Sequence, residues 1–201
     1  MRLAFIVSTT CLAAVLSSTP VAAETQYDVG LLAGWLKTSP AGTALSFHVG
    51  PSYEVTLARQ VWRNAAVSVA VEIPFFAQNS ISTKTPGALL PREYASLFLT
   101  PGVRLHVRPE RRVSVYGTFG GGYARYSESK LREDGGPNPQ QRDTNAGALQ
   151  FGAGVDVRGG SWLGLRGEVR DIVTGARQFS IAVPNSTVHN IIMSLGVGIR
   201  F

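Results

Sequence analysis

The chain has 201 residues, 22 glycines, a single cysteine and a formal net charge of +6, and its length is enough for one domain. A single cysteine excludes an internal disulfide framework. The basic residues are dispersed along the sequence rather than clustered, so the positive charge does not indicate a nucleic acid partner.

The first 23 residues have the layout of a secretory signal peptide. Met1-Arg2 is a short positive segment, residues 3–16 are mostly apolar, and Val21-Ala22-Ala23 is a small-residue cleavage site. We expect cleavage near Ala23 and a mature chain, residues 24–201, that forms one domain. No later run of eighteen or more apolar residues occurs, so no membrane-spanning helix is expected.

The rest of the chain repeats one pattern, in which apolar residues occupy every second position and small or polar residues lie between them. This alternation is typical of strands with one apolar face and one polar face. It predicts an all-β domain of eight strands, over residues 28–35, 45–57, 67–75, 96–107, 113–123, 149–158, 163–170 and 188–201.

The last of these strands shows the pattern most clearly. From Ile191 every odd position is apolar, the even positions from Ser194 to Arg200 are small or polar, and the strand ends on Phe201. A final alternating strand that closes on an aromatic residue resembles the assembly signal of bacterial outer-membrane β-barrels. In a soluble protein the same pattern would be a half-buried edge strand.

The connections between the predicted strands alternate in length. Short turns on one side and longer polar loops on the other are typical of transmembrane barrels, where the short turns are periplasmic. An even number of strands then places both termini on the periplasmic side. The short connections are 58–64, 109–112 and 159–161, the long ones are 77–92, 128–143 and 175–186, and the first connection, 37–43, is brief.

Charged residues fall on the face opposite to the bulky apolar residues. A soluble lipocalin-type barrel has its apolar residues inside. The lumen of an eight-stranded barrel is only wide enough for side chains, and the polar face here is rich in Gly, Ser and Thr. Four acids among five arginines can pair there, so we predict a buried charge network inside the barrel. Its predicted members are Glu54, Glu72, Arg104, Asp156, Arg158, Arg166, Glu168, Arg170 and Arg200.

Aromatic residues near the ends of the apolar face fit a membrane-spanning barrel, in which they would form girdles at the two interfaces. In the alternative, a soluble β-sandwich, they would be core aromatics. The residues are Tyr27, Trp35, Phe75, Tyr123 and Phe201.

The signal peptide, the eight strands, the charged lumen and the terminal Phe201 together resemble the small outer-membrane β-barrel proteins of the OmpA transmembrane-domain, OmpX and OmpW kind. Residues 163–175, LGLRGEVRDIVTG, are similar to the penultimate strand of outer membrane protein β-barrel domains. The resemblance implies an antiparallel up-and-down transmembrane β-barrel in the outer membrane of a Gram-negative-type bacterium. The resemblance does not imply a cofactor. It implies contact with outer-membrane lipids and lipopolysaccharide, and with the barrel-assembly machinery during insertion.

Some barrels of this size resemble lipid A deacylases, which carry a Ser/His/acid set on the lipid face. His189 has the parity of that face, with Ser186 and Thr187 close by, but no acid follows it in the sequence. His48 and His106 share the parity of the lumen charges. They belong to different strands and lack Cys or paired acid neighbours, so a metal site is not predicted.

A narrow conduit for hydrophobic compounds is a further alternative, and it would need an apolar lumen. Leu32, Phe98 and Tyr116 are the apolar residues that we assign to the lumen, which is too few for such a conduit. We therefore predict a non-enzymatic structural or surface-display barrel with a plugged charged lumen. Its extracellular loops would be available to a ligand that the sequence does not identify.

Overall fold

The structure is a computed structural model that describes residues 26–38, 49–82, 93–132, 134–139, 143–175 and 187–201. The predicted signal peptide and His48 lie outside these residues. The described ranges contain no helix that is long and apolar enough to cross a membrane. The strands in the described ranges are β1 (Tyr27–Thr38), β2 (Gly50–Arg63), β3 (Val67–Ser82), β4 (Glu93–Leu99), β5 (Gly102–Val107), β6 (Val113–Glu128), β7 (Asp143–Arg158), β8 (Leu163–Thr174) and β9 (Val188–Arg200).

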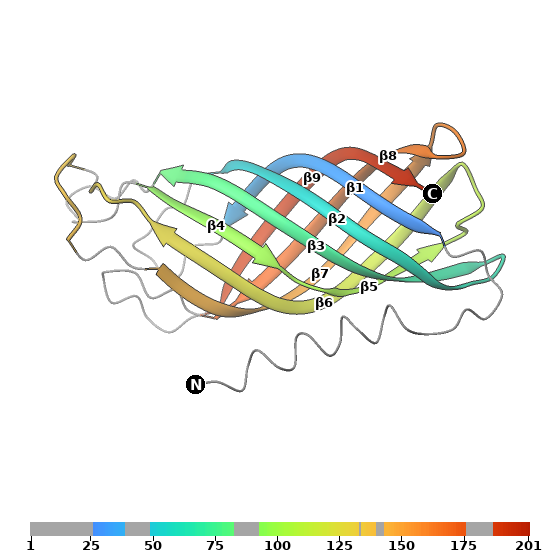
Figure 1. The fold of residues 1–201 in the computed structure, drawn as a ribbon, viewed down its shortest axis with the longest axis horizontal. Coiled ribbons are helices and arrows are strands. Elements are labelled where there is room, and N and C mark those ends of the chain that lie inside the picture. Colours follow the sequence, from blue (N-terminus) through green and yellow to red (C-terminus); the bar gives the residue numbers. More distant parts are fainter. Residues whose placement is uncertain (1–25, 39–48, 83–92, 133, 140–142, 176–186) are drawn as a thin grey trace.

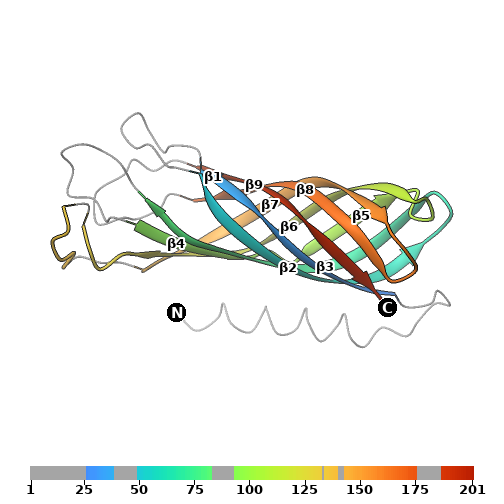
Figure 2. The ribbon, with the colours of Figure 1, turned by 90° about the horizontal axis from the view of Figure 1, so that it is seen from above.

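The strands form one antiparallel sheet that closes on itself (Figures 1 and 2). β1 pairs with β2 on one side and with β9 on the other. At the end of this seam the Tyr27 amide donates to the Phe201 carbonyl (2.8 Å), and the Phe201 amide donates to the Tyr27 carbonyl (3.0 Å). Closure removes the open sheet edges that a lipid environment does not tolerate.

β4 and β5 together occupy one strand position of the barrel. Both pair with β3 on one side and with β6 on the other. The break between them falls at Thr100 and Pro101, where proline cannot supply a ladder N–H. The backbones are close here, because a Cβ on Gly122 would lie 2.0 Å from the carbonyl oxygen of Leu99. The predicted eight-stranded barrel is confirmed, with one strand interrupted.

Several strands extend further than the alternation predicts. β3 continues to Ser82. β2 continues to Arg63, so the turn predicted over 58–64 contracts to residues 64–66. The Asn64 side chain holds this turn, because its oxygen accepts from the amides of Ala66 (2.8 Å) and Val67 (2.7 Å). Strict alternation stops early in β2 because its pairing with β3 shifts register between Gln60 and Trp62, whereas the backbone ladder continues beyond this irregularity.

The two faces of the barrel differ sharply in accessibility. Leu165 is 59% exposed on the outer surface, while its neighbour Arg166 is fully buried inside. The same contrast holds for Leu195 on the outside and Glu72 on the inside. Figure 1 shows the turns 64–66, 108–112 and 159–162 at the same end as the C-terminus. Short turns identify this end as the periplasmic one.

Candidate functional site

The lumen is filled by two layers of side chains. Among the described residues, the layer nearer the periplasmic end contains the buried arginines and the buried carboxylates other than Glu128. The layer nearer the extracellular end is mainly apolar and aromatic, and the hydroxyls of its tyrosines contact the buried Thr38, Thr174 and Asn190. Its apolar and aromatic members among the described residues are Leu36, Phe76, Tyr94, Phe98, Ala124, Tyr126, Ala148, Ile172 and Ile192.

Arg166 is the centre of one group of charges. Its guanidinium donates two hydrogen bonds to Asp156 (2.8 and 3.1 Å) and two to Asp28 (2.8 and 3.0 Å). Asp156 also accepts from Arg200 Nη2 at 2.8 Å, and its Oδ2 lies 3.1 Å from His106 Nε2. Each carboxylate therefore has several charged or polar partners, which offsets the cost of its burial.

Arg170 is the centre of a second group. Its Nη1 donates to Glu72 Oε1 (2.7 Å), its Nη2 donates to Glu168 Oε2 (3.0 Å), and its Nε contacts Glu168 Oε1. Glu54 Oε1 lies 3.3 Å from Arg170 Nη2. The Tyr116 hydroxyl donates to Glu168 Oε2 at 2.6 Å. Three glutamates thus surround one arginine.

Arg104 connects the two groups. Its Nη2 lies 2.6 Å from Glu72 Oε2 and its Nη1 lies 3.1 Å from Asp28 Oδ1. Arg104 and Arg166 also face the ring of Tyr116, at 5.0 and 5.6 Å from its centroid. Such cation–π contacts stabilise a guanidinium that has left water. The result is one continuous network through the middle of the barrel.

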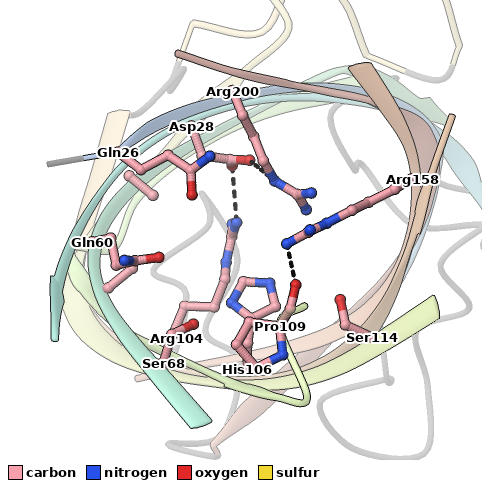
Figure 3. Close-up of a pocket in the computed structure, with 12 residues that line it drawn as sticks. Gln26, Asp28, Gln60, Ser68, Arg104, His106, Pro109, Ser114, Arg158 and Arg200 are labelled. Carbon is pink, nitrogen blue, oxygen red and sulfur yellow. Dashed lines mark hydrogen bonds and ion pairs between the residues drawn. The ribbon is translucent and has the colours of Figure 1, made fainter. Parts of the chain in front are cut away.

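Arg158 is the predicted member that the structure does not bring into this network. It lies at the periplasmic mouth, where its Nη2 donates to the carbonyl of Pro109. No carboxylate in the described part of the chain pairs with it. Arg158 and Arg200 point into a cavity of about 40 Å³, large enough for water, between the network and the periplasm (Figure 3).

Two parts of the lumen escape the sequence analysis. Asp28 pairs with three arginines. The sequence feature that could have identified it is its place among the small and polar residues that alternate with apolar ones along the first strand. The apolar layer is larger than the three residues assigned from the sequence. Its signal is again parity, because Ile172 and Phe76 follow the lumen charges Arg170 and Glu72 at even spacings. The apolar layer was hidden because an inward position is not always polar.

The outer surface has a polar pair near the extracellular end. His189 Nδ1 lies 2.7 Å from Asp171 Oδ2 on the neighbouring strand. The acid therefore precedes His189 in the sequence rather than following it. Ser186 lies outside the described residues, and Thr187 is exposed. In the described ranges no group of three His, Cys, Asp or Glu side chains could hold a metal ion.

Aromatic side chains mark both ends of the outer surface. Trp35 is exposed towards the extracellular end of β1, and the rings of Tyr27 and Phe201 stack at the periplasmic seam with centroids 6.0 Å apart. Trp62 and Trp162, which the sequence analysis left out, are also exposed beside periplasmic turns. Trp62 follows the apolar Val61 and Trp162 precedes the apolar Leu163, so strict alternation of apolar and polar residues did not single them out.

The family model for the outer membrane protein β-barrel domain matches residues 8–201. The chain belongs to this family. A comparison with curated proteins found no match. The family and the closed barrel together identify an outer-membrane protein of a Gram-negative-type bacterium, as predicted.

Solved structures of outer-membrane barrels resemble this member of the family in fold. Neisserial surface protein A has a TM-score of 0.60 at 17% identity, with 87% of this chain and 97% of that chain covered. Ail from Yersinia pestis has a TM-score of 0.57 at 13% identity, with 89% and 100% covered. The N-terminal β-barrel domain of OprF from Pseudomonas aeruginosa has a TM-score of 0.52 at 10% identity, with 88% and 97% covered.

Proposed function

We propose that this protein is a non-enzymatic outer-membrane anchor, a plugged barrel that presents its extracellular loops to the outside. The observation that supports the proposal most directly is the filling of the lumen at two levels. Arg104, Arg166 and Arg170 are almost fully buried in the charge network. Beyond them, Tyr94 and Tyr126 are equally buried in the apolar layer.

Passage of an ion through this barrel would require both layers to open. The network would have to lose several charge-assisted hydrogen bonds, each of which is stronger than a neutral one. The apolar layer would then have to separate rings that contact each other, since Phe98 and Tyr126 pack edge to face with centroids 5.8 Å apart. A plugged barrel supports anchoring and display rather than transport.

Single-channel recording in planar bilayers tests the plugged lumen. The refolded wild-type barrel should give no sustained unitary conductance. A variant with Arg170→Ala, Tyr94→Ala and Tyr126→Ala removes side chains from both layers and should conduct. Sustained conductance from the folded wild-type protein would contradict the proposal.

The proposed extracellular ligand is a polyanionic saccharide. Ail has been solved in complex with the heparin analogue sucrose octasulfate. Here the β6–β7 connection carries exposed Lys130 and half-buried Arg132. Sucrose octasulfate should bind the refolded barrel in isothermal titration calorimetry, and Lys130→Gln with Arg132→Gln should weaken that binding. Equal affinity of the wild type and this variant for sucrose octasulfate would show that these two side chains do not bind it.

A lipid-modifying hydrolase is the second candidate function, and the contact between His189 and Asp171 is the observation that favours it. An imidazole oriented by a carboxylate is the general-base half of a hydrolytic triad. Its position near the extracellular end of the outer surface is within reach of lipopolysaccharide. If the barrel is a deacylase, mass spectrometry of lipid A incubated with it should show loss of an acyl chain, and His189→Ala should abolish that loss. Unchanged lipid A would reject the hydrolase.

A further inference from the structure

The β5–β6 connection concentrates positive charge at the periplasmic end of the barrel. Its sequence, residues 108–112, is Arg-Pro-Glu-Arg-Arg. The side chains of Arg108, Arg111 and Arg112 are all exposed. Three guanidinium groups within five residues at a membrane boundary form a cluster, in contrast to the dispersed charge of the rest of the sequence.

No carboxylate in the described part of the chain neutralises these three arginines. The one acid of the turn, Glu110, is paired with Arg63 from β2. The other acids near this end, Asp28 and Asp156, are committed to the arginines of the lumen. The turn therefore presents its charge to whatever lies outside the protein.

The turn is held in shape by contacts on its inner side. Pro109 is buried at the lumen mouth and its carbonyl accepts from Arg158. The Arg108 amide donates to the carbonyl of Ala66 (2.7 Å), and the Arg111 amide donates to the carbonyl of Arg108 (3.0 Å). Arg108 has a left-handed backbone, with φ at 53°. Because the backbone is already fixed, binding a ligand here would cost little ordering of the chain.

The arginines border a hollow on the outer surface of the barrel. Arg108, Arg111 and Arg112 line it together with three valines that face the membrane, Val107, Val113 and Val115. Charged groups thus lie at the periplasmic margin and apolar side chains lie beside them along β5 and β6. A phospholipid has the same order, with a phosphate above its acyl chains. Guanidinium groups match phosphate geometry in a bidentate manner.

We propose that this hollow binds the headgroup phosphate of an anionic phospholipid in the periplasmic leaflet, with the first acyl carbons against the valines. The position at the end with the short turns favours a periplasmic phospholipid over lipopolysaccharide, which occupies the opposite leaflet. Clusters of basic residues at a membrane surface attract anionic lipids. This selectivity for lipid is separate from the proposed display function.

Trp62 is a natural reporter for the site. It pairs with Val69 of β3, which pairs with Leu105 of β5, two residues before Val107. In a Trp35→Phe, Trp162→Phe background it is the single tryptophan. This barrel is reconstituted in phosphatidylcholine vesicles that contain either brominated phosphatidylglycerol or brominated phosphatidylcholine. Quenching of Trp62 fluorescence gives the relative binding constant of the two lipids.

Phosphatidylglycerol should be preferred at least fivefold, and Arg108→Gln, Arg111→Gln and Arg112→Gln together should reduce that preference at least threefold. The control removes three exposed charges from the other end, with Lys37→Gln, Arg125→Gln and Lys130→Gln, and should keep the preference. A heat-modifiable gel shift verifies folding. If the triple variant does not fold, Arg111→Gln with Arg112→Gln replaces it.

A wild-type preference below fivefold would overturn the proposal. A reduction of the phosphatidylglycerol preference by less than threefold in the turn variant would also overturn it, because the preference would then originate elsewhere on the barrel. An equal reduction in the control would do the same, since it would show a dependence on total charge rather than on this turn.

Discussion

Arg166 illustrates how a single residue affects the stability of this barrel. Truncation by Arg166→Ala would leave Asp28 and Asp156 without their main partner, and loss of one member of a buried pair typically costs about 3–5 kcal/mol. Leu165→Ala should cost less, because this side chain already faces an apolar solvent. Urea unfolding of both variants in the same detergent measures the difference.

Glu168→Ala is the companion variant in that experiment, because it removes the partner of Arg170 and Tyr116. It should also be less stable than Leu165→Ala. If Leu165→Ala were the most damaging of the three, the apolar face would be the interior and the assignment of faces would be reversed.

Parity along each strand indicates which side chains share the lumen, but not which of them meet. Asp28 and Arg166 are 138 residues apart and lie on different strands that are not neighbours in the sheet. Their contact depends on how far the strands are staggered when the barrel closes. Stagger is a property of the closed sheet, so no local pattern specified these pairs. The same reason explains why Arg158 was assigned to the network that it does not join.

At the scale of a single element, the interrupted strand β4–β5 depends on glycine in the facing strand β6. Gly122→Ala would place a Cβ 2.0 Å from the Leu99 carbonyl oxygen, so the backbones would have to separate at the break. We expect a loss of about 1–3 kcal/mol or failure to fold, as for other overpacked sites. Gly117→Ala on the same strand is the control, because its nearest atom would be 3.9 Å away. Comparable folding yields and urea midpoints for the two variants would show that the close approach is not needed.

The alternation of apolar and polar residues located every strand of the barrel, but not the residues at which the strands end. Arg63 and Ser82 end strands that the pattern stopped earlier, because the register shifts between Gln60 and Trp62 and between Gln78 and Ile81 interrupt strict alternation. The interruption at Pro101 was not expected either. The apolar residues keep their alternation on both sides of it, at Leu97, Leu99, Val103 and Leu105, so the pattern carried no sign of a break.

The orientation of the whole molecule predicts which connections a protease can reach. Trypsin added to intact cells should cleave the β6–β7 connection, residues 129–142, where Lys130 is exposed on the extracellular side. The arginines of 108–112 are equally exposed but periplasmic, so they should be cleaved only after the outer membrane is permeabilised. Mass spectrometry of the fragments distinguishes the two. Cleavage in 108–112 of intact cells would mean that the barrel is inserted the other way round.

Closure of the whole barrel takes place at the seam between β1 and β9, and Phe201 is its last residue. Its amide and carbonyl both bond to Tyr27, its ring stacks on the Tyr27 ring, and its side chain is 69% exposed on the outer surface.

We propose that Phe201 is also the terminal signal for assembly. Deletion of Phe201, or Phe201→Asp, should reduce the heat-modifiable barrel in outer-membrane fractions severalfold while export to the periplasm continues. The matched control is Phe119→Asp, a charge introduced at an exposed aromatic in the middle of β6. This control should destabilise the barrel in lipid, because the introduced carboxylate would face the hydrocarbon of the membrane. A Phe201 deletion that assembled as well as the wild type would show that the residue closes the seam without being required for assembly.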